Sequence, residues 1–253
     1  MGVRQGRRHD DAKREAGNER SPSRFPLRVR VFPFPPFLSV QVTGLKALSR
    51  RPGFVAVEVD GARFAVLPVE QVQALGLAPR RDLTEDDRRN LERAGALSEA
   101  HARALRLLAA RGRSVREMVR RLRARGYPPD VVTEVVGRLE ASGLLDDRSF
   151  AEAVARSRAE RRYGPARIRA DLTARGVERR VAERAVDAVV EGDEPSRLAA
   201  IDALVRKRAG QLRGASPQAC ERRLRAYLAR RGFTGADVLS VVRRVMRDAG
   251  RAR

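Results

Sequence analysis

The chain has 253 residues, 42% of them hydrophobic, which is enough to bury a core and excludes a wholly disordered protein. Its 54 Lys and Arg residues against 32 Asp and Glu residues give a formal net charge of +22 at pH 7. A surplus of this size indicates a polyanionic partner, and nucleic acid is the first candidate.

The single cysteine, Cys220, excludes an intrachain disulfide, and two histidines, His9 and His101, are too few for a Cys/His zinc site. The longest uncharged run, residues 31–45, contains three prolines and is shorter than the roughly 20 apolar residues of a membrane span. The basic start lacks the apolar core of a signal peptide. We therefore expect a cytoplasmic protein with no membrane partner and no metal.

Residues 1–39 carry nine basic and four acidic residues and finish in a Pro-rich stretch that cannot form a periodic element. We interpret them as a disordered, basic, Pro-rich tail. Its positive charge would add to nonspecific binding of a polyanion, although a solvated tail or a misplaced start codon fits the composition equally well.

Residues 40–79 predict a small antiparallel sheet with a short helix at 69–75. Two apolar runs flank Asp60-Gly61, the strongest short-range signal for a hairpin, and residues 40–45 alternate as a third strand. A two-residue turn there pairs Val59 with Ala62, Glu58 with Arg63, Val57 with Phe64 and Val55 with Val66. The valines of these pairs, with Phe64, would share one face and need a covering surface.

From residue 80 onward the pattern is helical. This part of the chain contains 41 basic and 25 acidic residues, so most of the positive charge lies on the predicted helices. We assign residues 80–97 to a connecting helix. Three later helices end alike, in Leu122-x-x-Arg125-Gly126, Leu172-x-x-Arg175-Gly176 and Leu228-x-x-Arg231-Gly232, and each lies between two further apolar helices. This internal repeat predicts three tandem three-helix units at 98–147, 148–193 and 194–253.

The predicted fold class is therefore mainly α: a tandem array of three-helix, helix-turn-helix-like repeats. A small antiparallel β-hairpin or sheet element and a disordered N-terminal tail precede the array. Helix starts are indicated by a Ser114/Glu117 capping box and by Pro165 and Pro217 in first turns. The acidic pairs Asp86-Asp87 and Asp146-Asp147 precede helices, so we interpret them as caps and not as metal ligands.

The sequence offers no catalytic constellation and no cofactor motif. None of the three lysines follows a glycine, as a phosphate-binding loop requires, and no G-x-G-x-x-G follows a strand. His101 stands alone among alanines and is interpreted as a solvated or core-edge side chain. Cys220 falls near the start of an apolar helix face and is interpreted as a small buried hydrophobe.

Arginines on the middle helix of each unit, or leading into it, form the candidate nucleic-acid interface. Exposed helix faces are ordinarily charged, but residues 111–125 contain seven arginines and one acid, which is too lopsided for i,i+4 pairing. Aromatic residues are few and occupy core positions of the repeat, so we expect backbone electrostatics rather than base stacking. The candidate contact residues are Arg113, Arg116, Arg120, Arg123, Arg125, Arg158, Arg161, Arg162, Arg167, Arg169, Arg222, Arg223, Arg225 and Arg230.

Two long segments resemble the RecX family, regulators of the RecA recombinase. They are Gly143-Leu-Leu-Asp-Asp-Arg-Ser-Phe-Ala151 and Tyr163-Gly-Pro-Ala-Arg-Ile-Arg-Ala-Asp-Leu-Thr-Ala-Arg-Gly-Val177. The similarity extends over residues 40–248, and the N-terminal hairpin is similar to a form found in some members. The Pro-rich tail and the longer third repeat depart from the family pattern.

The resemblance implies an elongated, curved helical array that lies along the groove of the RecA filament on single-stranded DNA. It implies inhibition of ATP-driven strand exchange, without catalysis or cofactor, although the sequence does not decide between inhibiting and assisting recombination. We expect a monomer that binds single-stranded DNA, with double-stranded DNA as a further candidate partner. Two alternatives stay open: a helix-turn-helix DNA-binding repressor and a nonspecific RNA-binding protein. Base readout would require Asn, Gln or Ser among the arginines, and residues 111–125 offer only Ser114, which disfavours the repressor.

Overall fold

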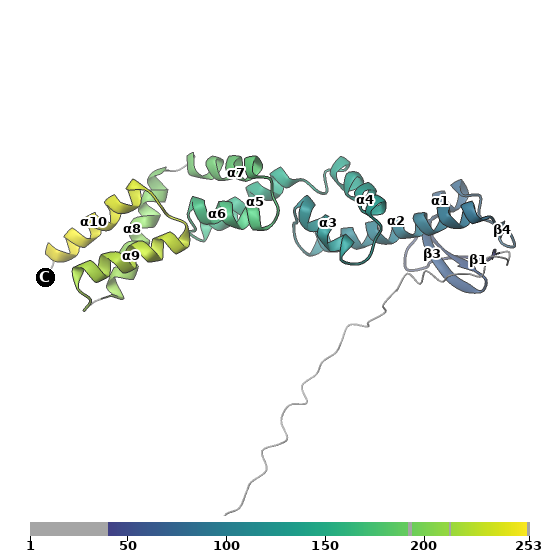
Figure 1. Cartoon of the computed structure of the whole chain (residues 1–253), viewed down its shortest axis with the longest axis horizontal. Helices are drawn as coiled ribbons and strands as arrows, with labels where there is room; N and C mark the ends of the chain where they lie inside the picture. Colours follow the sequence, from purple (N-terminus) through teal and green to yellow (C-terminus); the bar gives the residue numbers. More distant parts are fainter. Residues whose placement is uncertain (1–39, 192–193, 213, 252–253) are drawn as a thin grey trace, which may run out of the picture. The chain divides into compact units, whose positions relative to one another are not determined.

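The computed structural model describes residues 40–191, 194–212 and 214–251, a small sheet followed by helices (Figure 1). The predicted disordered tail, residues 1–39, lies outside the described residues. Among the described helices, none combines the length and the apolar composition needed to cross a membrane.

The N-terminal element is a four-stranded antiparallel sheet in the order β3-β2-β1-β4. The three predicted strands and the short helix are confirmed. Their bounds are β1 Val40–Ala47, β2 Phe54–Val59, β3 Ala62–Pro68 and α1 Val69–Ala74. The fourth strand, β4 (Asp82–Leu83), was not predicted, because two residues are too short to show an alternation.

The predicted hairpin turn is confirmed, but the register beyond it is wrong. Asp60 and Gly61 take positive φ values of 49° and 78°, as a two-residue hairpin turn requires, and Val59 pairs with Ala62. After Glu58 and Arg63 the register shifts, so the later pairs are Val57 with Ala65, Ala56 with Val66 and Val55 with Leu67. A β-bulge at Phe64 places one additional residue in β3.

The bulge changes which side chains of β3 face the core. Because side chains alternate along a strand, one inserted residue moves every later side chain to the other face. Ala65 and Leu67 are therefore buried, while Phe64 and Val66, the residues predicted to face inward, are only half-buried.

One long helix joins the sheet to the first repeat. Helix α2 (Glu85–Ala110) begins five residues after the predicted start of the connecting helix at residue 80, because β4 occupies residues 82–83, and it then continues without a break through the first helix of the first unit. Thr84 and Asp87 form a reciprocal capping box at its start. Leu91 belongs to the core of the sheet and Leu97 to the core of the first unit, so the helix is shared by two cores.

Three three-helix units follow the sheet, as predicted. The first consists of the end of α2, α3 (Val115–Arg123) and α4 (Pro129–Ala141). The second consists of α5 (Asp147–Glu160), α6 (Pro165–Ala174) and α7 (Arg179–Glu191). The third consists of α8 (Glu194–Gly210), α9 (Pro217–Arg231) and α10 (Ala236–Arg251).

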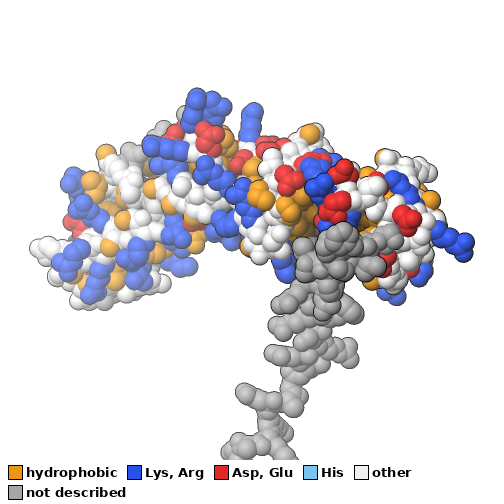
Figure 2. Space-filling model, turned by 45° about the vertical axis from the view of Figure 1, so that its right-hand side comes forward, with side chains coloured by type: hydrophobic (Ala, Val, Ile, Leu, Met, Phe, Trp, Pro, Cys, Tyr) orange, Lys and Arg blue, Asp and Glu red, His pale blue; other side chains and the backbone are white. Residues whose placement is uncertain are grey.

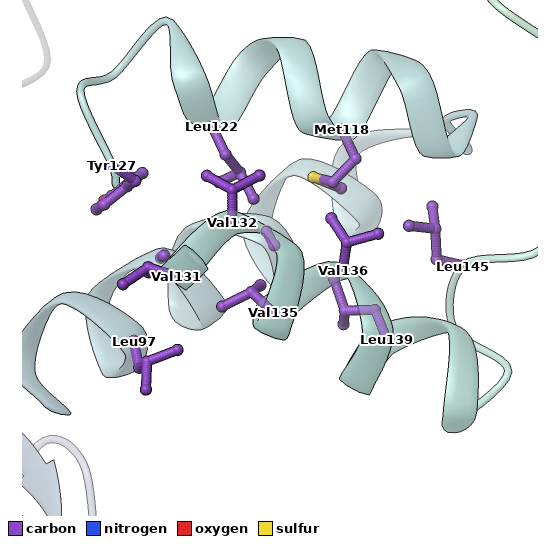
Figure 3. Packing of buried hydrophobic residues seen from close by; sticks show 12 residues of the cluster. Leu97, Met118, Leu122, Tyr127, Val131, Val132, Val135, Val136, Leu139 and Leu145 are labelled. Carbon is purple, nitrogen blue, oxygen red and sulfur yellow. The ribbon is translucent and has the colours of Figure 1, made fainter. Parts of the chain in front are cut away.

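Each unit buries its own apolar stripe. In the first unit, Met118 and Leu122 of α3 point at Val132 and Val136 of α4 (Figure 3), and all four are buried. The second and third units have separate cores of the same kind. The i, i+4 spacing of the apolar residues on each middle helix therefore predicts the buried face correctly.

The repeated Arg-Gly ends share one backbone geometry. Gly126, Gly176 and Gly232 have φ values of 87°, 85° and 86°, the left-handed conformation that glycine adopts at little cost at a helix end. The sequence repeat is thus a repeat of helix termination.

Neighbouring units contact each other at their middle helices. The end of the middle helix of one unit meets the start of the middle helix of the preceding unit. Gly164 N, at the start of α6, donates to the carbonyl of Arg231 at the end of α9, over 2.7 Å. Ala166 N donates to the Gly232 carbonyl over 3.2 Å. Free amides of one helix start and free carbonyls of another helix end therefore satisfy each other. We call this contact the second joint.

The first joint connects the first and second units in a similar way. The Ser114 hydroxyl, at the start of α3, donates to the carbonyl of Arg175 at the end of α6. Asp147 accepts a hydrogen bond of 2.8 Å from Val115 N, so it caps α3, whereas Asp146 caps its own helix as predicted. A β-carbon at Gly176 would lie 2.7 Å from the Cβ of Arg116.

Candidate nucleic-acid interface

The arginines predicted on α3 lie opposite its buried face, with one exception. Arg116, Arg120 and Arg123 are exposed, as is Arg125 beyond the helix end. Within the described part of the chain, the side chains of Arg120, Arg123 and Arg125 form no ion pair. These guanidinium groups are available to phosphate oxygens, with which arginine forms paired hydrogen bonds.

Arg113 is the exception, because its side chain is buried and not exposed to a partner. It precedes the capping residue Ser114, outside the helical stripe, and is only 7% exposed. Its Nε donates to the Leu107 carbonyl over 3.0 Å, and its guanidinium pairs with Glu117. A side chain held in this way supports the fold and does not reach a partner.

Glu117 is a buried carboxylate shared by three arginines, so the predicted capping box is only half formed. Ser114 accepts from Glu117 N, but the carboxylate bonds to Arg111 at 2.6 Å, to Arg121 at 3.0 Å and to Arg113. Burial alone would raise the pKa of Glu117, but these hydrogen bonds and charges outweigh it and hold that pKa below 4.5.

In the second unit the predicted arginines fall into two groups. Arg158 and Arg167 both pair with Asp171, over 2.9 and 3.1 Å, and the Arg158 side chain is largely covered. Arg161, Arg162 and Arg169 are exposed and form no ion pair among the described residues.

In the third unit all four predicted arginines lie exposed on α9. Arg225 approaches Glu221 within 3.8 Å, while Arg222, Arg223 and Arg230 have no ion pair in the described ranges. In the space-filling view of the whole chain, Lys and Arg side chains are prominent over the left-hand part of the picture, and Asp and Glu side chains are more frequent further right (Figure 2).

A pocket that the sequence did not predict lies at the first joint. It has a volume of about 290 Å³ and combines residues from the end of α2, from α5 and from the end of α6. Its lining residues are Arg111, Gly112, Phe150, Ala153, Val154, Ser157, Arg158, Arg161 and Arg175. We call this site the joint pocket.

Among the charged and aromatic residues that line the joint pocket, sequence reasoning missed three: Arg111, Phe150 and Arg175. Arg175 lies 6.0 Å from the centre of the Phe150 ring. The only available signal was that Arg175 belongs to the repeated Arg-Gly motif. Its equivalent in the third unit, Arg231, lies about 5.5 Å from two tyrosine rings and supports the second joint, so the motif alone does not distinguish a structural arginine from a binding one.

The remaining candidates for chemistry are structural. Cys220 is buried in the core of the third unit, as predicted. His101 is half-buried, and burial, helped by the charge of Arg138, lowers its pKa below 6.5. In the described part of the chain no three His, Cys, Asp or Glu side chains are grouped to hold a metal.

Comparison with known proteins gives a consistent result. Three family models match in chain order: the first, second and third three-helix domains of RecX, over residues 100–139, 146–186 and 196–242. The chain is 41% identical over 149 residues to the regulatory protein RecX of Halorhodospira halophila, covering 58% of this chain and 89% of that protein. It is 40% identical over 146 residues to the regulatory protein RecX of Xanthomonas axonopodis pv. citri, with 58% and 87% covered.

Two solved structures share the fold. A crystal structure of a regulatory protein RecX matches with a TM-score of 0.66 at 19% identity, covering 81% of this chain and 98% of that one. RecX from Lactobacillus salivarius matches with a TM-score of 0.54 at 20% identity, covering 59% and 96%. With three matched domains in order and relatives near 40% identity, the chain belongs to the RecX family of regulatory proteins.

Proposed function

We propose that this member of the family regulates the RecA recombinase by binding its filament on single-stranded DNA and inhibiting ATP hydrolysis and strand exchange. The proposal places the protein in the cytoplasm, in DNA recombination and repair. Its relatives are named regulatory proteins, which supports a regulator and not an enzyme.

The observation that carries the proposal is that exposed arginines without ion pairs recur in all three units of the described chain. Arg120 and Arg123 represent the first unit, Arg161 and Arg162 the second, and Arg222, Arg223 and Arg230 the third. Each set can make only weak contacts, but the units are covalently linked, so contacts along one polymer act at a high effective concentration.

The test is recombinase ATPase activity on single-stranded DNA with the wild-type protein and two variants. Arg120→Glu/Arg123→Glu reverses two charges on the exposed face of α3. Arg116 is left intact, because its side chain lies against Gly176 in the first joint. Arg180→Glu/Arg184→Glu is the charge-matched control, since both residues are exposed on α7, which is not a middle helix.

We expect the wild-type protein to inhibit, the α3 variant to require a much higher concentration, and the control to resemble wild type. Unchanged ATPase activity at saturating wild-type protein would exclude the proposal. Equal inhibition by the α3 variant and wild type would show that this face is merely solvated.

A further inference from the structure

Four arginines line the joint pocket, together with small and apolar residues. Arg111 comes from the end of α2, Arg158 and Arg161 from the end of α5, and Arg175 from the end of α6. No Asp or Glu is among the lining residues. The site therefore exists only because the first and second units meet.

The carboxylates behind the pocket are too few to neutralise its arginines. Glu117 is shared by Arg111 and two further arginines, and Asp171 is shared by Arg158 and Arg167. Arg161 and Arg175 form no ion pair among the described residues. A bound anion would supply the missing negative charge, and guanidinium groups bind phosphate with paired hydrogen bonds.

The wall of the pocket is flat and apolar. Phe150 lies between Gly112 and Arg175, and Ala153 and Val154 extend the same α5 face. A β-carbon at Gly112 would lie 3.3 Å from the Phe150 ring, so the absence of a side chain there lets the segment between α2 and α3 pack closely against one edge of that ring. An aromatic wall beside cations suits a planar, polarisable ring better than a flexible aliphatic chain.

We propose that the joint pocket binds a nucleoside phosphate, with the base against Phe150 and the phosphate on Arg161 and Arg175. The pocket volume of about 290 Å³ lies just below the roughly 300–1,000 Å³ typical of small-molecule sites, which suits a ligand no larger than a single nucleotide unit. The inference deepens the nucleic-acid part of the proposed function and rests on it. An acidic peptide would use the same arginines but would leave the aromatic wall without a role.

The test measures binding of a labelled single strand and of an abasic strand with the same backbone, without recombinase. Phe150→Leu removes the aromatic ring and keeps an apolar side chain. We expect it to weaken binding of the base-bearing strand at least about fivefold, the lower range for one stacked base, and to leave the abasic strand unchanged. The abasic strand also reports folding, because a misfolded variant would lose both ligands.

Arg161→Gln/Arg175→Gln tests the phosphate part. We expect the log-log salt slope for single-strand binding to become shallower by about 1.4, since each phosphate contact contributes about 0.7. The matched control is Arg180→Gln/Arg184→Gln on α7, which should change the slope much less. Equal changes in the two variants would overturn the proposal.

Competitors identify the source of the nucleotide. Displacement of the strand by adenosine monophosphate or ATP, lost in the pocket variants, supports a free nucleotide. Base-dependent strand binding without such displacement supports a subsite for the nucleic-acid strand. If poly-glutamate displaces the strand and Phe150→Leu has no effect, the pocket is an acidic-peptide site and the proposal is wrong.

Failure of this inference is distinguishable from failure of the proposed function. If the wild-type protein inhibits the recombinase but shows no Phe150-dependent binding, the proposed regulatory function stands and the proposed nucleotide site is wrong. Conversely, if binding depends on Phe150 but the protein leaves the recombinase unaffected, the proposed nucleotide site stands and the proposed regulatory function is wrong.

Discussion

Glu117 is the residue on which the electrostatics of the first unit depend. Its side chain is 5% exposed, and Arg113, 7% exposed, is buried beside it. Removing one partner of a buried ion pair leaves the other as an uncompensated charge, which costs far more than the intact pair contributes.

Glu117→Ala is therefore expected to lower the free energy of unfolding by about 3–5 kcal/mol. Glu134→Ala is the control, because Glu134 also bonds two arginines, Arg93 and Arg138, but at a more exposed site, where the loss should be about 1 kcal/mol or less. Urea unfolding of both variants checks the difference. Similar losses would show that burial does not govern the strength of the Glu117 cluster.

The pH dependence of stability should carry two opposite contributions from this region. The folded-state pKa of Glu117 lies below 4.5, so its stabilisation is present above that pH and is lost as the pH falls through the folded value. Burial, the main cause, raises the pKa of Asp147 above 3.8, so ionising it in the folded state costs stability as the pH rises past 3.8.

Asp147→Asn keeps an acceptor for Val115 N and removes the charge, so it should be neutral or slightly stabilising at pH 7. Its advantage over wild type should disappear as the pH falls below 3.8, where Asp147 is protonated in both the folded and the unfolded states. Urea midpoints across this range test the sign. A clear loss of stability at pH 7 would mean that the charge itself holds the cap.

At the scale of elements, the glycines of the three Arg-Gly motifs occupy equivalent positions in the sequence but differ in how closely other helices approach them. All three Arg-Gly glycines have left-handed φ values, but their surroundings differ. A β-carbon at Gly126 would meet nothing within 4 Å, whereas one at Gly232 would lie 2.3 Å from the backbone nitrogen of Arg167.

Gly126→Ala should cost only the strain of a left-handed alanine, about 1–2 kcal/mol. Gly232→Ala should cost clearly more, because its methyl group must push apart the backbones of α6 and α9 in the second joint. Thermal unfolding of the two variants provides the comparison. Equal losses would indicate that the second joint is not closed in solution.

The β-bulge gives a second comparison between neighbouring residues. Leu67 is fully buried, and Val66 is half-buried on the other face. Leu67→Ala should cost about 2–5 kcal/mol and Val66→Ala clearly less, measured by urea unfolding. The order would be reversed in the unbulged register that the sequence alone predicts.

The elements that the sequence predicts well are helices whose apolar residues recur with helical spacing and whose end is marked by a glycine. Met118 and Leu122, four residues apart and followed by Arg125-Gly126, define both the buried face of α3 and its end. The β3 register failed because the run from Phe64 to Leu67 is apolar at every position, so alternation could not specify which face is buried.

The candidate site was harder to predict because the exposure of an arginine depends on tertiary contacts that the local sequence pattern does not specify. Arg113 and Arg120 look alike in the sequence, yet one is buried beside Glu117 and the other is free of ion pairs in the described chain. Phe150 and Arg175 are 25 positions apart and meet only where α5 and α6 form the joint pocket. No local pattern records such a meeting.

At the scale of the whole molecule, positive charge and helical repeats coincide. Residues 40–79 hold nearly balanced charges, whereas the units carry the arginine surplus. In repeat proteins each unit contacts its neighbours, so a partner that follows the repeats can engage the same kind of surface several times. Salt dependence measures how many of these surfaces act on one strand.

Two pairs of arginines on different units allow that count: Arg120→Gln/Arg123→Gln on α3 and Arg222→Gln/Arg223→Gln on α9. All four side chains are exposed and lack ion pairs among the described residues, so unfolding midpoints should stay close to wild type. On a long single strand each pair should make the salt slope shallower by about 1.4, and the combined variant by about 2.8.

On a strand too short to reach both units, one unit binds at a time. Either pair alone should then leave most of the slope intact, and only the combined variant should reduce it. Additive losses on short strands as well would mean that the two units act as one local patch, and no change on long strands would mean that these faces do not contact DNA.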